Sequence, residues 1–152
     1  MVSIDSCRLL DFQDRIDERG GLVIAEAFKE IPFEIRRVFY MFNIPDRKSR
    51  GAHAHKECHQ VLIAPSGCFT VEIDDGINQR RILMNDPLKG LYIPPCIWAS
   101  ELLFEPNAVC LVLASDNYDE SDYIRSYDDY LSFRGVGCAT GKKNDREDFC
   151  VI

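Results

Sequence analysis

The fold is decided by the stretch Gln60-Val61-Leu62-Ile63-Ala64-Pro65-Ser66-Gly67-Cys68-Phe69-Thr70-Val71-Glu72-Ile73-Asp74-Asp75-Gly76, where two short apolar runs each end in turn residues. We interpret the two runs, Gln60 to Ala64 and Cys68 to Ile73, as strands joined by a hairpin at Pro65-Ser66-Gly67. A second turn at Asp74-Asp75-Gly76 leads into a third strand, Gln79 to Met84.

The same pattern continues in both directions along the chain. Short runs of apolar and β-branched residues recur at Cys7 to Leu10, Leu22 to Ala25, Ile35 to Ile44, Leu91 to Ile93, Ala99 to Phe104 and Val109 to Ala114. A glycine-bearing turn, Asp17 to Gly21, lies between the first two runs. Strands at this spacing favour a sandwich or barrel over βαβ units.

Only one stretch, Ser126 to Phe133, has the pattern of a helix. We therefore expect an all-β fold with a short C-terminal helix, in a single domain over residues 1–134. The remaining residues, 135–152, contain three glycines and a run of charges, and we expect a flexible tail there.

Composition narrows the possible functions. The chain has 152 residues with 18 basic and 25 acidic side chains, a net charge of −7, which disfavours nonspecific binding to nucleic acid or anionic membranes. Seven cysteines include no CxxC pair, so neither a zinc knuckle nor a thioredoxin motif is indicated. With no signal-peptide pattern and no apolar stretch of membrane-spanning length, we expect a cytoplasmic protein with reduced thiols.

All three histidines fall within seven residues, at His53, His55 and His59. On an extended strand without a bulge, the three side chains point to the same face. Imidazole titrates near neutral pH and is a common metal ligand, so such a cluster indicates proton transfer or metal binding rather than a purely structural role.

The metal hypothesis is the weaker of the two. The HxHxxxH pattern is similar to the first metal motif of the cupin superfamily, but the later segment Leu91 to Trp98 supplies no further histidine. Acid–base catalysis without a metal or cofactor also explains the basic residues before the motif, since a cation can stabilise the enolate that forms. These residues are Arg36, Arg37, Arg47, Lys48 and Arg50.

A set of motifs spanning residues 17–125 resembles one family. They include Asp17-Glu18-Arg19-Gly20, Ile31 to Tyr40, Arg50-Gly51-Ala52-His53-Ala54-His55-Lys56, Trp98 and Ala114 to Arg125. The chain resembles the nucleotide-sugar 3,4-ketoisomerases, metal-independent cupins that act on dTDP-4-keto-6-deoxyglucose. The resemblance implies a cupin jelly-roll β-barrel, no cofactor and a homodimer.

The resemblance also implies roles for individual residues. His53 and His55 would be the catalytic pair facing the sugar, Tyr40 would bind the oxyanion, and Arg37 and Arg50 would hold the diphosphate. Further substrate contacts are expected from Arg19, near the same end of the pocket, and from Trp98, against the sugar. His59 stands where the family carries an acidic residue, so it is expected near the sugar as an altered part of the proton relay.

Two other features follow from the residues around these motifs. Tyr118, Tyr123, Tyr127 and Tyr130 are expected to pack the C-terminal segment onto the barrel. Ala99-Ser100 after Trp98 replaces a larger polar residue of the family, which leaves both the glucose- and the galactose-configured 3-keto products open.

The implied reaction moves a carbonyl from C4 to C3 of the sugar through an enediol(ate). Three alternatives remain: a related dTDP-sugar epimerase, a non-catalytic cupin that binds a sugar nucleotide, and a metal-dependent oxygenase. Solvent-hydrogen exchange at individual carbons separates the two isomerases, and a non-catalytic cupin would bind nucleotide without turnover.

Overall fold

The structure is a computed structural model that describes residues 1–46 and 48–136. The chain enters through a short 3-10 helix, η1 (Ile4–Ser6), and continues mainly as strands. The strands are β1 (Arg8–Asp11), β2 (Gln13–Asp17), β3 (Gly20–Ile24), β4 (Arg37–Phe42), β5 (Arg50–His55), β6 (Gln60–Ser66), β7 (Phe69–Asp74), β8 (Gln79–Met84), β9 (Lys89–Ile93), β10 (Trp98–Leu102), β11 (Val109–Ala114) and β12 (Tyr123–Ile124). A second 3-10 helix, η2 (Glu120–Asp122), precedes β12, and α1 (Tyr127–Arg134) follows it.

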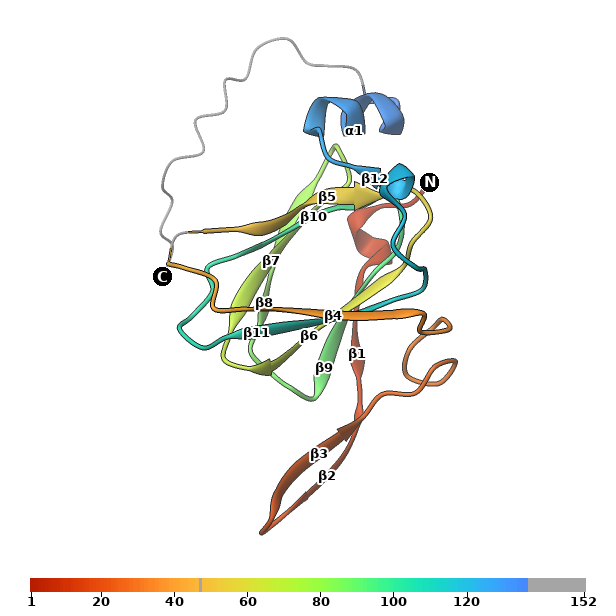
Figure 1. Ribbon diagram of the computed structural model, residues 1–152. Helices are drawn as coiled ribbons and strands as arrows, with labels where there is room; N and C mark the ends of the chain where they lie inside the picture. The colour runs from red at the N-terminus through yellow and green to blue at the C-terminus, as the bar shows by residue number, and fades with distance from the viewer. Residues whose placement is uncertain (47, 137–152) are drawn as a thin grey trace.

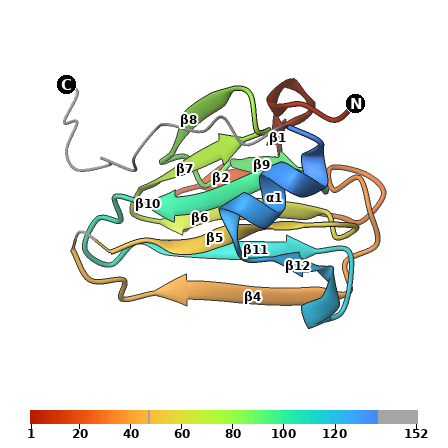
Figure 2. The ribbon, with the colours of Figure 1, turned by 90° about the horizontal axis from the view of Figure 1, so that it is seen from above.

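Two five-stranded antiparallel sheets pack face to face (Figures 1 and 2). The first sheet has the order β1-β9-β6-β11-β4 and the second has the order β12-β5-β10-β7-β8. Strands β4 and β12 therefore lie at the same edge of the sandwich, one in each sheet (Figure 2). The prediction of an all-β fold with a short C-terminal helix is confirmed.

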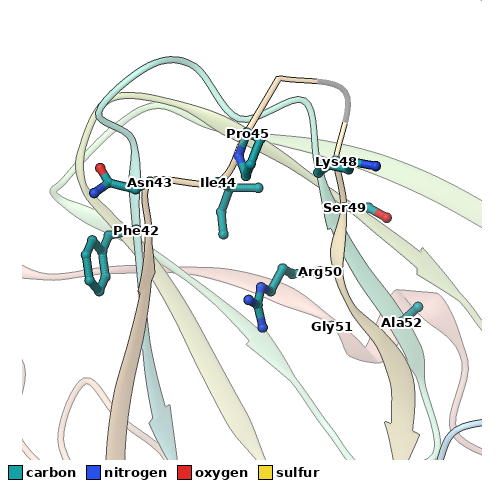
Figure 3. A pocket seen from close by; sticks show the side chains of 9 residues that line it. All are labelled: Phe42, Asn43, Ile44, Pro45, Lys48, Ser49, Arg50, Gly51 and Ala52. Atoms are coloured by element: carbon teal, nitrogen blue, oxygen red, sulfur yellow. The ribbon is translucent and has the colours of Figure 1, made fainter.

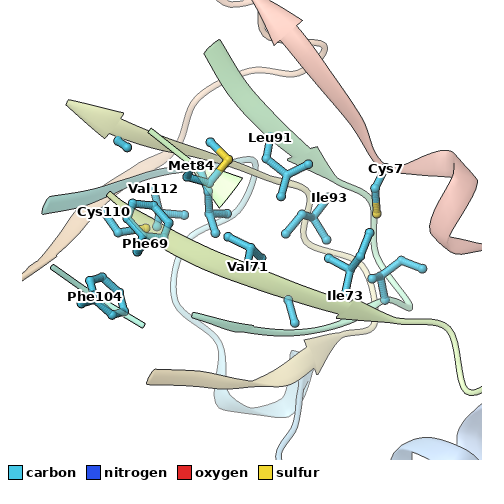
Figure 4. Packing of buried hydrophobic residues seen from close by; sticks show 14 of the residues in the cluster. Cys7, Phe69, Val71, Ile73, Met84, Leu91, Ile93, Phe104, Cys110 and Val112 are labelled. Atoms are coloured by element: carbon cyan, nitrogen blue, oxygen red, sulfur yellow. The ribbon is translucent and has the colours of Figure 1, made fainter. Parts of the chain in front are cut away.

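Strand alternation separates the inner and outer faces of the first sheet. Leu62 pairs with Leu91 in register, and both are buried in the core between the sheets. The neighbouring pair, Val61 and Tyr92, lies on the outer face, beneath the segment that carries Ile31 and Phe33. Figure 4 shows the inner core, which includes Cys7, Phe69, Val71, Ile73, Met84, Leu91, Ile93, Phe104, Cys110 and Val112.

The two turns of the opening stretch have different structures. Asp74-Asp75-Gly76 forms a hairpin between β7 and β8, as predicted, and Asp75 Oδ1 accepts hydrogen bonds from the amides of Ile77 and Asn78. The hairpin predicted at Pro65-Ser66-Gly67 is wrong, because β6 belongs to the first sheet and β7 to the second. Gly67 has φ of 66°, and a Cβ there would meet Ala108, so this turn needs glycine.

The turn at residues 17–21 joins different strands from those expected. It connects β2 to β3, and the stretch Gln13 to Asp17, which carries no clear alternation, was missed as a strand. The β2–β3 hairpin extends away from the two packed sheets (Figure 1).

The C-terminal helix is the predicted one. Ser126 caps its first turn by accepting from the amide of Asp129, and Gly135 ends it with φ of 69°. Tyr130 is fully buried and its hydroxyl donates to the carbonyl of Asp74, so α1 packs onto the second sheet as expected. The predicted tail falls almost entirely on residues 137–152, outside the described residues. Among the described helices, none is long and apolar enough to cross a membrane.

Candidate active site

The site is built on β5, which lies between β12 and β10. His53 is in register with Ala99 of β10, whose side chain lies in the inner core, and His55 is in register with Tyr123 of β12. Directly opposed residues of antiparallel strands point to the same face. Both histidines therefore face the interior of the sandwich, while Ala54 between them packs outward against α1.

The two histidines contact each other directly. Their Nε2 atoms lie 3.1 Å apart, and the rings meet edge to face with centroids 4.8 Å apart. One hydrogen bond between two Nε2 atoms requires that one nitrogen carries a proton and the other does not. The pair is therefore arranged to share a proton.

Asp122 fixes the orientation of His55. Its Oδ2 lies 2.7 Å from Nδ1 of His55, and its Oδ1 accepts from the amides of Lys56 and Glu57 at 3.0 and 2.7 Å. With the carboxylate ionised, Nδ1 of His55 carries the proton, and its Nε2 is left as an acceptor in the neutral ring. The hydrogen bond between the rings then runs from Nε2–H of His53 to Nε2 of His55.

Tyr123 and Arg37 complete the interior face of the site. The Tyr123 ring lies 4.3 Å from the ring of His55 and 4.9 Å from that of His53, measured between centroids. Arg37, at the start of β4, donates from Nη1 to the Tyr123 hydroxyl at 3.3 Å, which links the edges of the two sheets. Its Nε is buried and has no hydrogen-bond partner among the residues that the structure describes, so it is an unused donor in the site.

A second layer of charge lies over Tyr123. The Arg125 guanidinium lies 4.4 Å from the centre of the Tyr123 ring and forms a salt bridge with Glu120 at 2.6 Å. Tyr118 donates its hydroxyl to the same carboxylate. These contacts hold the segment before β12 against the histidine pair.

The surroundings keep the histidines neutral. Burial, the neighbouring His55 and the guanidinium of Arg125 lower the pKa of His53 to about 4. Burial also lowers the pKa of His55, although Asp122 opposes the shift. Burial disfavours the ionised form of Asp122, but the hydrogen bonds from His55 and from the Glu57 amide prevail and its pKa is lowered. At neutral pH the pair is poised to accept a proton.

A bulge at the start of β5 brings Arg50 to the same face as the histidines. Arg50 pairs with Glu101 and His53 pairs with Ala99, so two residues of β5, Gly51 and Ala52, lie opposite one residue of β10, Ser100. Gly51 occupies the bulge with φ of 71°, and a Cβ there would lie 1.8 Å from the Glu101 carboxylate. Without the bulge, residues 50 and 53 would alternate to opposite faces.

Arg50 borders a pocket of about 530 Å³ between the end of β4 and the start of β5. Figure 3 shows its side chain extending into this space from β5. Other lining residues include Phe42, Ile44, Lys48 and Ala52. The pocket therefore combines an open cationic side chain with apolar walls.

Two of the predicted site residues, Tyr40 and Trp98, lie on outer faces because of strand alternation. Tyr40, expected to bind the oxyanion, pairs with Leu111 on the outer face of the first sheet and is 63% exposed, so this chain does not bring it beside its own histidine pair. Trp98 was expected against the sugar, but it packs on Tyr127 and Tyr130 beneath α1, with ring centroids 5.3 and 5.5 Å away.

His59 does not share the face of the other two histidines. The chain turns after His55, and the His59 Nδ1 lies 2.7 Å from the hydroxyl of Tyr92, with Phe33 also in contact. It packs on the outer face of the first sheet, so the expectation of three histidines on one face is wrong. Arg19, at the tip of the β2–β3 hairpin, is exposed and paired with Asp17, away from the histidines of its own chain.

Reasoning from the sequence missed the role of Asp122 and interpreted Tyr118 and Tyr123 only as packing residues. All three belong to Ser115-Asp116-Asn117-Tyr118-Asp119-Glu120-Ser121-Asp122-Tyr123-Ile124-Arg125, a segment already notable for its charges and tyrosines. Only the pairing of β12 with β5 places that segment beside the histidines.

Comparisons with known proteins identify the family of this chain. Residues 5–135 match the family described as "FdtA: WxcM-like, C-terminal". The TDP-4-oxo-6-deoxy-alpha-D-glucose-3,4-oxoisomerase of Aneurinibacillus thermoaerophilus is 43% identical over 126 residues, covering 83% of this chain and 91% of the relative.

Two solved structures are similar over most of their length. The TDP-quinovose 3,4-ketoisomerase WlaRB of Campylobacter jejuni is 45% identical with a TM-score of 0.81, over 85% of this chain and 99% of that one. A mutant of the 3,4-ketoisomerase QdtA of Thermoanaerobacterium thermosaccharolyticum, in complex with TDP-4-keto-6-deoxyglucose, is 40% identical with a TM-score of 0.83, over 84% and 93% of the chains. The chain thus belongs to the FdtA family of TDP-sugar 3,4-ketoisomerases, and it is an isomerase.

Proposed function

We propose that the protein converts dTDP-4-keto-6-deoxyglucose into a dTDP-3-keto-6-deoxyhexose by histidine acid–base catalysis through an enediol(ate). The observation that carries this proposal is the direct contact between the Nε2 atoms of His53 and His55, 3.1 Å apart on the interior face. The substrate named for the related QdtA complex supports the choice of sugar.

The reaction requires two proton transfers at carbon. The pair removes the proton from C3, and the electrons of that C–H bond form a C3–C4 double bond while the C4 carbonyl oxygen takes up the negative charge. The C3 hydroxyl proton passes to the oxygen on C4. Delivery of a proton from the pair to C4, after exchange with solvent, then leaves the carbonyl at C3. We assign both carbon proton transfers to the pair, without dividing them between its members.

The neighbours of the pair fit the remaining requirements. Asp122 orients His55 and stabilises a positive charge on it, while the unpartnered Nε of Arg37 offers a hydrogen bond to a developing oxyanion or to phosphate oxygens. Arg50, exposed in its pocket, supplies a forked cation for the diphosphate. No metal or cofactor has a part in this scheme.

The experiment is to incubate the purified protein with dTDP-4-keto-6-deoxyglucose in deuterium oxide and to locate the deuterium by NMR. We expect deuterium at C4 of a 3-keto product and, through the reverse reaction, at C3 of the recovered 4-keto substrate. Exchange at C5 as well as C3, with a stereoisomer and no 3-keto sugar as product, would instead indicate an epimerase. Nucleotide binding without any exchange would indicate a non-catalytic binding protein.

We also propose that two copies form a homodimer. Ile16 and Leu22 on the β2–β3 hairpin are 64% and 55% exposed, and the outer face of β4 exposes Val38, Tyr40 and Phe42. A two-stranded hairpin is at best marginally stable alone in water, so it gains from packing on another surface. Sedimentation should give a dimer, and Leu22→Asp should weaken it; a wild-type monomer at assay concentration would refute the proposal.

The product of this reaction has a ketone at C3, which is the group that an aminotransferase converts into an amine. We propose that the protein acts in the cytoplasm, in the synthesis of a deoxyamino sugar. Purified aminotransferases that accept a 3-keto-6-deoxyhexose nucleotide offer a coupled assay, and failure of the product to serve as their substrate would contradict this placement.

A further inference from the structure

Three side chains that can ligate a metal ion meet on the far side of His55 from His53. A ring nitrogen of His55, the sulfur of Cys58 and a carboxylate oxygen of Asp122 all lie within 4.8 Å of one another. We propose that these residues form a binding site for a zinc-like divalent ion, and that the bound ion inhibits the enzyme by taking the orienting carboxylate from His55.

The local fold brings the three residues together. His55 ends β5, Cys58 lies in the turn that leads to β6, and Asp122 ends η2 just before β12 pairs with β5. The amides of this turn also bind the Asp122 carboxylate, so turn and carboxylate are held against each other. The cluster therefore does not depend on long, flexible side chains.

The distances suit a tetrahedral ion after small movements. Ligand atoms bound to zinc at about 2.0–2.3 Å lie roughly 3.3–3.8 Å from each other. The outermost separation of 4.8 Å must shorten by about 1 Å, and the 2.7 Å contact between His55 and Asp122 must open by less than that.

The donor set selects among metals. A thiolate, an imidazole and a carboxylate favour zinc over magnesium or calcium, which prefer oxygen ligands. Binding releases the thiol proton of Cys58 to solvent, and the proton on Nδ1 of His55 moves to Nε2, so the coordinating ring stays neutral. A fourth position is left for water, as in zinc sites with three protein ligands.

The site is enclosed but has an approach. His55 and Cys58 are 5% and 2% exposed, whereas Asp122 also borders a polar groove of about 570 Å³ lined by Lys56, Asp116 and Asp119 among others. An ion entering by this groove meets Asp122 first. The carboxylates that line the groove favour a cation over an anion.

Binding would act directly on the proposed catalytic pair. Once Asp122 binds the metal, the carboxylate no longer accepts from His55, and a metal-bound imidazole cannot exchange protons freely. The predicted inhibition rests on the proposed function of His55, whereas the binding itself does not.

The binding test uses the whole chain without a histidine tag, titrated with cobalt(II) as a spectroscopic substitute for zinc. We expect one tightly bound ion per chain with a sulfur-to-cobalt charge-transfer band, displaced by zinc. Cys58→Ala and Cys58→Ser should both abolish the band and weaken zinc binding at least tenfold. Cys68→Ser, a half-buried cysteine at the opposite end of the sandwich, is the matched control and should behave as wild type.

The activity test compares each protein with its own metal-free rate. A zinc concentration that lowers the wild-type rate at least tenfold, reversibly with a chelator, should leave Cys58→Ala with more than half its own rate. Equal zinc sensitivity of the two proteins, or a cobalt complex without a thiolate band, would overturn the proposal. If cobalt binds through Cys58 but no isomerase activity exists, the metal site stands and the proposed function fails.

Discussion

The two ends of strand β5 carry polar groups in contrasting environments. At the His55 end, both histidines and Asp122 have direct hydrogen-bond partners and the rings are packed against Tyr123. At the Arg50 end, the arginine is exposed beside an open pocket, and Glu101 behind Gly51 is buried with an unpartnered oxygen. Groups that are already fixed suit proton transfer, and a free cation suits the capture of a charged ligand.

The strongest test of this contrast removes the imidazoles. Under the proposed mechanism, His53→Asn and His55→Asn should each lower kcat by about 10³-fold, because an amide cannot take up the proton from carbon. Affinity for dTDP, measured by calorimetry, should change only a few-fold, since the nucleotide is assigned to the arginines.

His59→Asn is the matched control for both variants. This histidine contacts Tyr92 and Phe33 on the outer face of the other sheet, so its loss should leave kcat within about threefold of wild type. A loss of turnover as large as that of His55→Asn would mean that the contrast between inner and outer histidines has no functional meaning.

The next largest effect is expected at Asp122. Asp122→Asn keeps the shape of the side chain but removes the charge that orients His55, and kcat should fall by about 10²-fold with KM nearly constant. Combined with His55→Asn, the second change should add little, because the carboxylate acts through that ring. Asp119→Asn, in the same segment, serves as control because its carboxylate accepts from Ser121 instead; fully additive losses would show that Asp122 acts by another route.

The sequence predicted most of the scaffold because alternation and turn residues are local signals. Strands β4, β6, β7, β8 and β11, the hairpin at Asp74 and the helix over Ser126 to Phe133 were all predicted. The turn at Pro65 was misassigned because proline, serine and glycine occur both in hairpin turns and in connections from one sheet to another. Only the long-range pairing of the strands distinguishes the two.

The site was predicted only in part, for a similar reason. His53, His55 and Arg37 are brought together as expected. Whether any other residue reaches the interior depends on its position along the strand, because alternate positions face opposite sides of the sheet. One bulge at Gly51 moves Arg50 to the interior face, and the turn after His55 removes His59 from it. Asp122 reaches the site through pairing across 67 residues, which no local pattern indicates.

At the open end of β5, a smaller effect on binding is expected. Arg50→Ala should raise KM for the nucleotide sugar about tenfold with kcat changed less than threefold, because one charge-assisted contact to phosphate is lost. Arg50→Lys should recover only part of the affinity, since an ammonium cannot form the forked contact. Arg36→Ala, which removes an outward arginine paired with Glu34, should leave KM unchanged; equal effects of the two alanine variants would exclude a specific role for Arg50.

The last effect concerns stability rather than activity and comes from Glu101, behind the bulge. Burial raises the pKa of this carboxyl from 4.5 in an ordinary glutamate to about 8. Between these pH values the folded protein keeps a proton that the unfolded chain has released, so the free energy of unfolding falls as pH rises from about 4.5 to 8. Above that range Glu101 is ionised in both the folded and the unfolded chain, so it causes no further change in the free energy of unfolding.

Glu101→Gln should remove this pH dependence, because the amide has nearly the same shape and no charge to bury. Each unit of pKa shift corresponds to about 1.4 kcal/mol, so we expect the variant to gain a few kcal/mol over wild type on going from pH 5 to pH 9. In thermal melts, the Tm of the variant minus that of wild type should be roughly 5–10 °C larger at pH 9 than at pH 5. Glu18→Gln, at the exposed tip of the β2–β3 hairpin, should show no such trend. Parallel melting curves for Glu101→Gln and wild type across this range would mean that Glu101 ionises without cost, and that the bulged end of β5 is as open to water at Glu101 as it is at Arg50.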